Sequence, residues 1–105
     1  MSGSTSGKQI LVATTATAGT LIHTAHATAL DEVWMWATNS STTAVKITVE
    51  WGEATASGNI EVTVPGESGS LLVVPGLPIK NSLVVRCFAG TINVITIGGY
   101  VNRLT

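Results

Sequence analysis

The sequence predicts an all-β protein, a single antiparallel β-sandwich of about eight short strands with jelly-roll-like connections. Three observations support this fold class. Short runs rich in Val, Ile and Thr alternate apolar and polar residues with the period of two expected of strands buried on one face. Turn-forming residues separate these runs at intervals of about 8 to 12 residues. Nowhere does a helical apolar period persist for three turns.

Length and composition limit the number of domains and the classes of partner. A chain of 105 residues forms one domain. Charged residues make up only 10% of the chain, against about 25% in average globular domains, so we expect another molecule to cover much of the surface. The net charge of −1 argues against a nucleic-acid partner, and the single cysteine cannot form an internal disulfide. No apolar run approaches the roughly 20 residues of a membrane span.

The first seven residues are predicted to form a flexible arm, and residues 8–105 form the sandwich domain. The arm consists of Met1, Ser2, Gly3, Ser4, Thr5, Ser6 and Gly7. These residues offer little to bury, and they lack the apolar segment of a signal peptide. The arm is either a frayed terminus or a segment that becomes ordered on a neighbouring subunit. We retain it as a candidate partner contact.

The strands follow one another along the chain. They are predicted at 8–14, 20–26, a hairpin over 31–51 with its loop at 39–43, then 59–64, 70–74, 83–89, 92–97 and 100–104. Pro75 and Pro78 are expected to end the strand that begins at Ser70, because proline cannot donate to a central ladder. The pair Gly98 and Gly99 predicts a bulge or a close backbone approach between the last two strands.

Two tryptophans stand out within the stretch 31–51. Val33 and Met35 fall on one face of the predicted strand, and Trp34 and Trp36 fall on the other. Large exposed aromatic surfaces usually mark contacts with partners. Three interpretations remain open: burial against the second sheet, contact with a subunit or capsid, or a platform on which sugars stack. We take a partner contact at Trp34 and Trp36 as the working interpretation.

Residue types that support catalysis or metal binding do not form a recognisable set. His23 and His26 are three residues apart, so on a strand they point to opposite faces and cannot chelate one metal together. Cys87 lies in a β-branched strand and is interpreted as a small buried apolar residue. The adjacent carboxylates Asp31 and Glu32 also point to opposite faces, unlike a glycosidase pair. We therefore predict no enzymatic activity, no cofactor and no metal site.

Two pieces of the chain carry a family resemblance. The first is the stretch 33–51 with its Asn/Ser/Thr-rich turn at 39–43, and the second is the segment 81–99 with the small turn Ala89-Gly90. In this order the strands and turns resemble the small β-sandwich virion proteins of tailed bacteriophages, of the capsid decoration (cement) or fibre-tip type. The likeness covers roughly residues 20–101, and Trp34, Trp36 and Trp51 depart from it.

The resemblance implies a structural protein without catalytic residues, usually oligomeric and often a trimer. The expected function is capsid decoration: the protein would stabilise the head by bridging neighbouring major capsid proteins. It would be assembled in the host cytoplasm and lie on the capsid surface of the virion. The alternatives are the receptor-binding tip of a tail fibre or spike, and a carbohydrate-binding β-sandwich module. A fibre tip usually has an N-terminal attachment domain, and the short arm here favours decoration.

Overall fold

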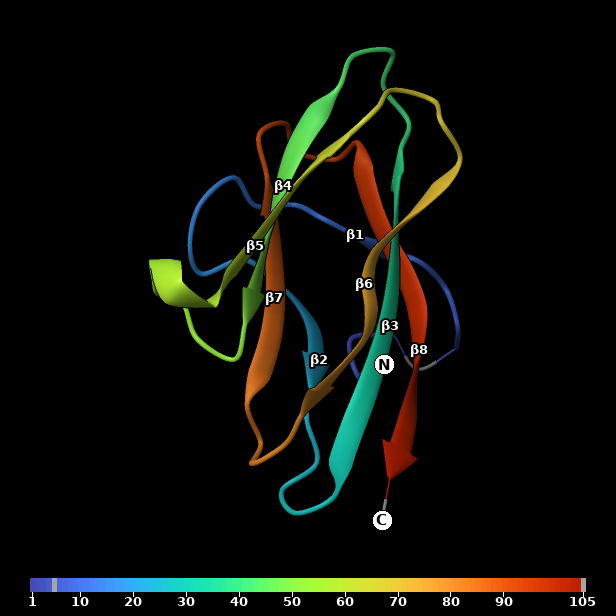
Figure 1. The fold of residues 1–105 in the computed structure, drawn as a ribbon. Helices are drawn as coiled ribbons and strands as arrows, with labels where there is room; N and C mark the ends of the chain where they lie inside the picture. The colour runs from blue at the N-terminus through green and yellow to red at the C-terminus, as the bar shows by residue number, and fades with distance from the viewer. Residues whose placement is uncertain (5, 105) are drawn as a thin grey trace.

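The computed structural model describes residues 1–4 and 6–104, which form two four-stranded antiparallel sheets packed face to face (Figure 1). The strands are β1 (Ile10–Leu11), β2 (Thr20–Thr24), β3 (Leu30–Asn39), β4 (Val45–Trp51), β5 (Asn59–Val64), β6 (Ser70–Ile79), β7 (Val84–Ala89) and β8 (Ile95–Leu104), with one short 3₁₀ helix, η1 (Ala56–Gly58). The strand orders are β1-β8-β3-β6 in one sheet and β2-β7-β4-β5 in the other. The predicted all-β sandwich is therefore confirmed, and its eight strands in two sheets have jelly-roll topology.

Most connections carry the chain from one sheet to the other. Only β4 and β5 are neighbours both in sequence and in a sheet. Strands β3 and β4 lie in different sheets, so the hairpin predicted over 31–51 is wrong; β7 and β8 are likewise separated. Alternation reveals which face of a strand is buried, and it does not reveal which strand the backbone pairs with. The apolar faces of β3 and β4 meet across the core instead of lying side by side.

Two strands run longer than the sequence predicts. Strand β6 continues through Pro75 and Pro78 because it lies at the edge of its sheet, where a missing N–H is tolerated. Strand β8 continues through Gly98 and Gly99 without interruption. The predicted close backbone approach does occur at Gly99, where an added Cβ would lie 1.9 Å from the carbonyl oxygen of Trp34. The glycine thus permits continuous pairing between β3 and β8.

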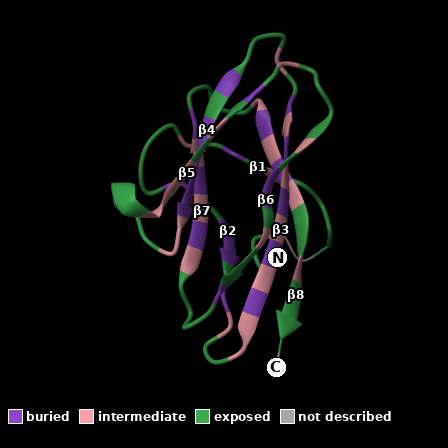
Figure 2. Ribbon diagram, viewed as in Figure 1, coloured by how far each residue is buried: buried purple, intermediate pink, exposed green. Residues whose placement is uncertain are grey.

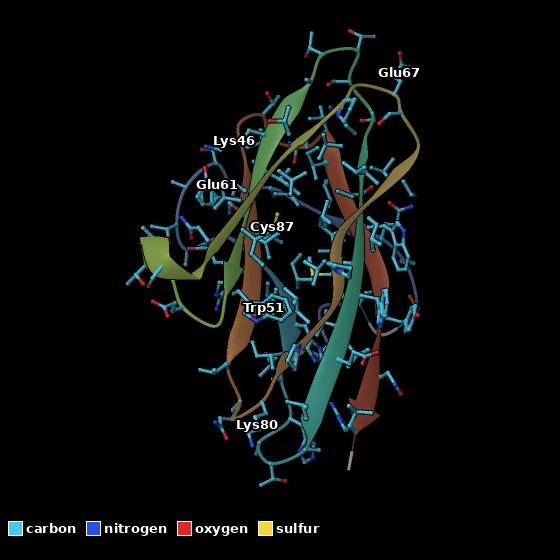
Figure 3. The ribbon with its side chains drawn as sticks, in the orientation of Figure 1. Lys46, Trp51, Glu61, Glu67, Lys80 and Cys87 are labelled. Carbon is cyan, nitrogen blue, oxygen red and sulfur yellow. The ribbon has the colours of Figure 1, made fainter. Side chains whose placement is uncertain are left out.

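The core lies between the two sheets and is built from aliphatic side chains (Figure 2). Its fully buried members are Val12, Ile22, Val33, Met35, Ala37, Ile47, Val49, Val64, Val74, Val85, Cys87, Ile95 and Ile97. The thiol of Cys87 belongs to this core, as predicted (Figure 3). Trp51 packs against its margin. Together these contacts supply the hydrophobic stabilisation that holds the sheets together.

The outer faces of the two sheets differ. On the β2-β7-β4-β5 sheet, Glu50 is buried under the segment that precedes β2, where it accepts hydrogen bonds from the Gly19 amide (2.6 Å) and the Thr17 hydroxyl. The same sheet bears an exposed ion pair between Lys46 and Glu61 (Figure 3). The outer face of the β1-β8-β3-β6 sheet instead carries Trp34, Trp36 and Tyr100, beside the polar side chains of Glu32, Thr38 and Ser70.

Candidate functional site

Three aromatic side chains, Trp34, Tyr100 and Trp36, stack on the outer face of the β1-β8-β3-β6 sheet, and we call them the aromatic row. The ring centroids of Trp34 and Tyr100 lie 6.2 Å apart at an interplanar angle of 14°. Those of Tyr100 and Trp36 lie 6.1 Å apart at 28°. Both tryptophans are half-buried, and Tyr100 is 53% exposed. Parallel offset rings at these distances are mutually attractive, so each ring restricts its neighbour's motion.

The strand register places the row. Trp34 stands opposite Tyr100 on β8, and Trp36 stands opposite Gly98. Directly opposed residues on neighbouring strands are close enough for their side chains to touch. On the other flank, an added Cβ at Gly76 would lie 2.7 Å from the Trp34 ring. The missing side chain at Gly76 therefore makes room for the indole.

The two ends of the aromatic row have different neighbours, a carboxylate beside Trp34 and a leucine beside Trp36. The indole N–H of Trp34 donates to the Glu32 carboxylate at 2.8 Å, which orients that ring. Leu72 on the edge strand stands opposite Trp36 and is 42% exposed. An exposed leucine beside three aromatic rings makes a contiguous apolar surface, the kind that marks interaction sites.

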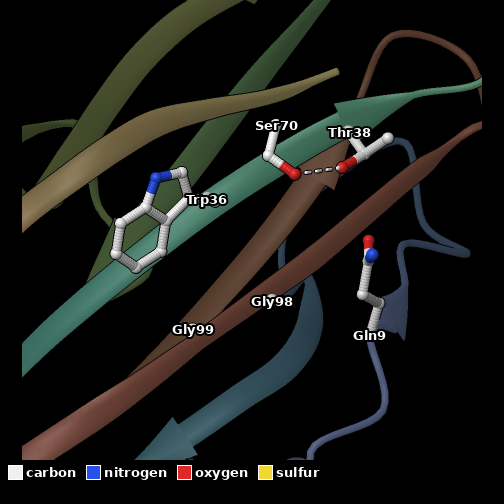
Figure 4. A pocket seen from close by; sticks show the side chains of 6 residues that line it. All are labelled: Gln9, Trp36, Thr38, Ser70, Gly98 and Gly99. Carbon is white, nitrogen blue, oxygen red and sulfur yellow. Dashed lines mark hydrogen bonds between the residues drawn. The ribbon is translucent and has the colours of Figure 1, made fainter.

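A small hollow lies beside Trp36 (Figure 4). It has a volume of about 290 Å³ and is open to solvent. Its lining residues are Gln9, Trp36, Thr38, Ser70, Gly98 and Gly99. Four segments that are distant in sequence meet here: the approach to β1, and strands β3, β6 and β8.

No protein-family model, no curated protein and no solved structure matches the chain. The residues themselves therefore carry the functional argument. Trp34 and Trp36 face away from the core, so burial between the sheets is excluded; their role as a partner contact stays a prediction. Sequence reasoning missed Tyr100, because the register that brings β8 beside β3 is not visible in the chain.

A buried carboxylate lies at the opposite end of β3. The Asp31 side chain is fully buried and accepts from Arg103 at both oxygens, with Nε to Oδ1 at 2.6 Å and Nη2 to Oδ2 at 3.0 Å. The Nε2 of His23 lies 2.8 Å from Oδ2, and the His26 amide donates to the same oxygen at 3.2 Å. The hydrogen bonds from Arg103, with those from His23 and His26, hold the pKa of Asp31 well below its usual range, against the effect of burial.

The contact between His23 and Asp31 has the geometry of a catalytic dyad, but its surroundings give it a structural role. The Nδ1 of His23 accepts the backbone amide of Ser2 at 3.0 Å, so Nε2 carries the proton that faces Asp31 in the neutral ring. Both ring nitrogens are thus engaged, and only 3% of the His23 surface is exposed. Catalysis by a general base needs a free nitrogen within reach of a nucleophile. The sequence did contain a sign that Asp31 is buried, because Asp31 lies two residues before buried Val33 and therefore on the same face of the strand.

Cys87 is likewise unsuited to chemistry. Its side chain is fully buried. Burial, as the main cause, and the negative charge of nearby Glu50, as the smaller one, raise the pKa of the thiol to about 12. Only the thiolate is an effective nucleophile or metal ligand. Cys87 therefore acts as a small apolar residue of the core.

The start of the predicted arm lies against β2. The Gly3 amide donates to the Ile22 carbonyl at 2.9 Å, and the Ser2 hydroxyl accepts the Thr24 amide at 2.7 Å. Met1 packs against the core cluster. Thr5 lies outside the described residues. The arm's role as a partner contact stays a prediction, and its first four residues have defined places on the domain.

Within residues 1–4 and 6–104, no three His, Cys, Asp or Glu side chains gather closely enough to hold a metal ion. In the same residues, no helix has the length and apolar character needed to cross a membrane.

Proposed function

We propose that the protein is a structural component of a phage virion, a capsid decoration protein that stabilises the head by bridging neighbouring major capsid proteins. In this role it forms a homo-oligomer, a trimer by the family resemblance, on the capsid surface after assembly in the host cytoplasm. The observation that carries the proposal is the aromatic row. Three stacked rings and an exposed leucine lie on a sheet face that bears little charge.

The physical support comes from the contrast between the two outer faces. On the β2-β7-β4-β5 sheet, the segment that precedes β2 covers Glu50, and Lys46 forms an exposed ion pair with Glu61. The β1-β8-β3-β6 sheet presents Trp and Tyr, the residues enriched in the cores of protein interfaces. Their rings are already ordered by stacking, so less side-chain entropy is lost when a partner covers them. A permanent contact in a particle uses a surface of this kind.

The test is Trp34→Ala, with Phe88→Ala as the matched control. Phe88 is a half-buried aromatic residue that lines a shallow hollow on the other sheet. Truncating an interface anchor costs about 2 to 4 kcal/mol of binding. We therefore expect Trp34→Ala to lose about 30- to 1,000-fold in affinity for shells of the major capsid protein of the same phage. Phe88→Ala should keep that affinity.

Two results would count against decoration. Equal loss of affinity in both variants would show that the aromatic row has no special part in attachment. A fall in melting temperature of Trp34→Ala without any separable loss of attachment would make the row a feature of the fold. A gene neighbourhood with fibre genes and no capsid gene would instead favour the receptor-binding tip.

A further inference from the structure

We propose that the hollow beside Trp36 is a binding site for a neutral saccharide. The site is separate from the rest of the aromatic row. In the register of β3 and β8, the pair Trp34 and Tyr100 precedes the pair Trp36 and Gly98, and Thr38 follows it; the hollow is lined by Trp36, Thr38, Gly98 and Gly99 and not by Trp34 or Tyr100. A partner that covers Trp34 therefore does not by itself fill the hollow. The inference goes beyond capsid decoration and does not depend on it.

The hollow exists because one strand position lacks a side chain. Gly98 stands opposite Trp36 in the middle of β8, where a β-branched residue would be favoured. An added Cβ there would meet only the exposed, flexible side chain of Gln9, with Cγ at 3.3 Å and Cδ at 3.8 Å. At Gly99, by contrast, the φ of +152° and the nearby Trp34 carbonyl require glycine. The fold thus demands glycine at position 99, whereas at 98 glycine opens a space.

The polar groups around the space are hydroxyls and an amide. The hydroxyls of Thr38 and Ser70 lie 3.2 Å apart, so one donates to the other and the second keeps its proton for a ligand (Figure 4). The Thr96 hydroxyl donates to Oε1 of Gln9, which leaves the Gln9 amide NH₂ as a double donor. None of the six lining residues is charged.

This combination selects a class of ligand. A pyranose has a face of C–H groups that packs on an aromatic ring and an edge of hydroxyls that both donate and accept. Trp36 supplies the ring, and Thr38, Ser70 and Gln9 supply complementary groups that donate and accept. Phosphates and other anions would lack a cation here, and a purely apolar ligand would leave the hydroxyls unpaired. At about 290 Å³ the space is at the small end of ligand sites.

The experiment is a titration of the ¹⁵N-labelled full chain with neutral sugars, observed at the indole N–H resonances. The probes are glucose, galactose, mannose, N-acetylglucosamine, lactose and cellobiose. Trp36→Phe identifies the Trp36 resonance by its disappearance. We expect at least one sugar to shift Trp36 saturably with a dissociation constant of about 1 mM, while Trp51 stays unchanged. The absence of any saturable shift up to about 100 mM would overturn the proposal.

Two variants locate the site. Gly98→Val fills the hollow and suits a strand, so we expect it to abolish the Trp36 shift while the melting temperature holds or rises. Thr38→Val removes a hydroxyl and keeps the shape, and it should weaken binding about tenfold, whereas Thr63→Val on exposed β5 should not. Undiminished sugar binding in Gly98→Val would overturn the proposal. If Gly98→Val fails to fold, the contrast between Thr38→Val and Thr63→Val decides.

Discussion

Asp31 is the residue whose charge contributes most directly to the fold. Its buried carboxylate joins β3 to Arg103 on β8 and to His23 on β2, so it links the two sheets. Removing one member of a buried charged network leaves its partners without hydrogen bonds. We expect Asp31→Asn to lower the free energy of unfolding by about 2 to 4 kcal/mol, measured by urea denaturation. Glu61→Gln, which breaks an exposed pair, should change it by less than about 1 kcal/mol.

The same carboxylate predicts a pH dependence. Because the pKa of Asp31 is lower in the folded than in the unfolded chain, where it is about 4, its contribution is complete above pH 4. The contribution is lost as the pH falls from about 4 toward the folded pKa. Wild-type stability should therefore decline on acidification below about pH 4, and Asp31→Asn should decline less steeply. Parallel acid profiles for the two proteins would contradict this assignment.

At the scale of single elements, the alternation of residues predicted which faces are buried. It placed Val33 and Met35 on one face and Trp34 and Trp36 on the other but left open whether the tryptophans are buried; the structure buries the first pair and leaves the second outside the core. It did not predict pairing, because strands of a jelly roll bond to partners far away in the sequence. The hollow beside Trp36 needs Gln9, Ser70 and Gly98 at one place, which only the register of three strands determines. The same limit concealed Arg103 as the partner of Asp31.

The N-terminal residues 2–4 belong to no strand, but they make contacts with β2. The Ser2 amide binds His23, and Gly3 lies so close to β2 that an added Cβ would be 2.4 Å from the Ile22 carbonyl oxygen. Deleting residues 2–4 should therefore lower the free energy of unfolding by about 1 to 3 kcal/mol, because buried acceptors lose their donors. Gly3→Ala should have a similar effect, and Ser6→Ala should have none. Unchanged thermal unfolding of the deletion would mean that the segment is a free arm.

At the scale of the whole molecule, the proposed function predicts self-association as a trimer, through a surface other than the aromatic row, which is assigned to the capsid contact. Sedimentation equilibrium at micromolar concentration should give a mass of about three times the 10.8 kDa of one chain. Because the aromatic row is assigned to the capsid contact, the trimer is expected to persist in both Trp34→Ala and Phe88→Ala. A wild-type mass equal to that of one chain would argue against an autonomous trimer.

The strand order also governs when the protein can fold during its synthesis. Strand β8 lies between β1 and β3, and β7 lies between β2 and β4, so one of the two inner positions in each sheet is filled by one of the last strands made. A nascent chain that ends at β6 has no partner for β1 or β2 and keeps the aliphatic faces of both sheets open. Until its final segment has been synthesised, the nascent chain is therefore incompletely folded and prone to aggregation. Folding then closes both sheets together, and the long-range pairing makes that step slow for a chain of this size.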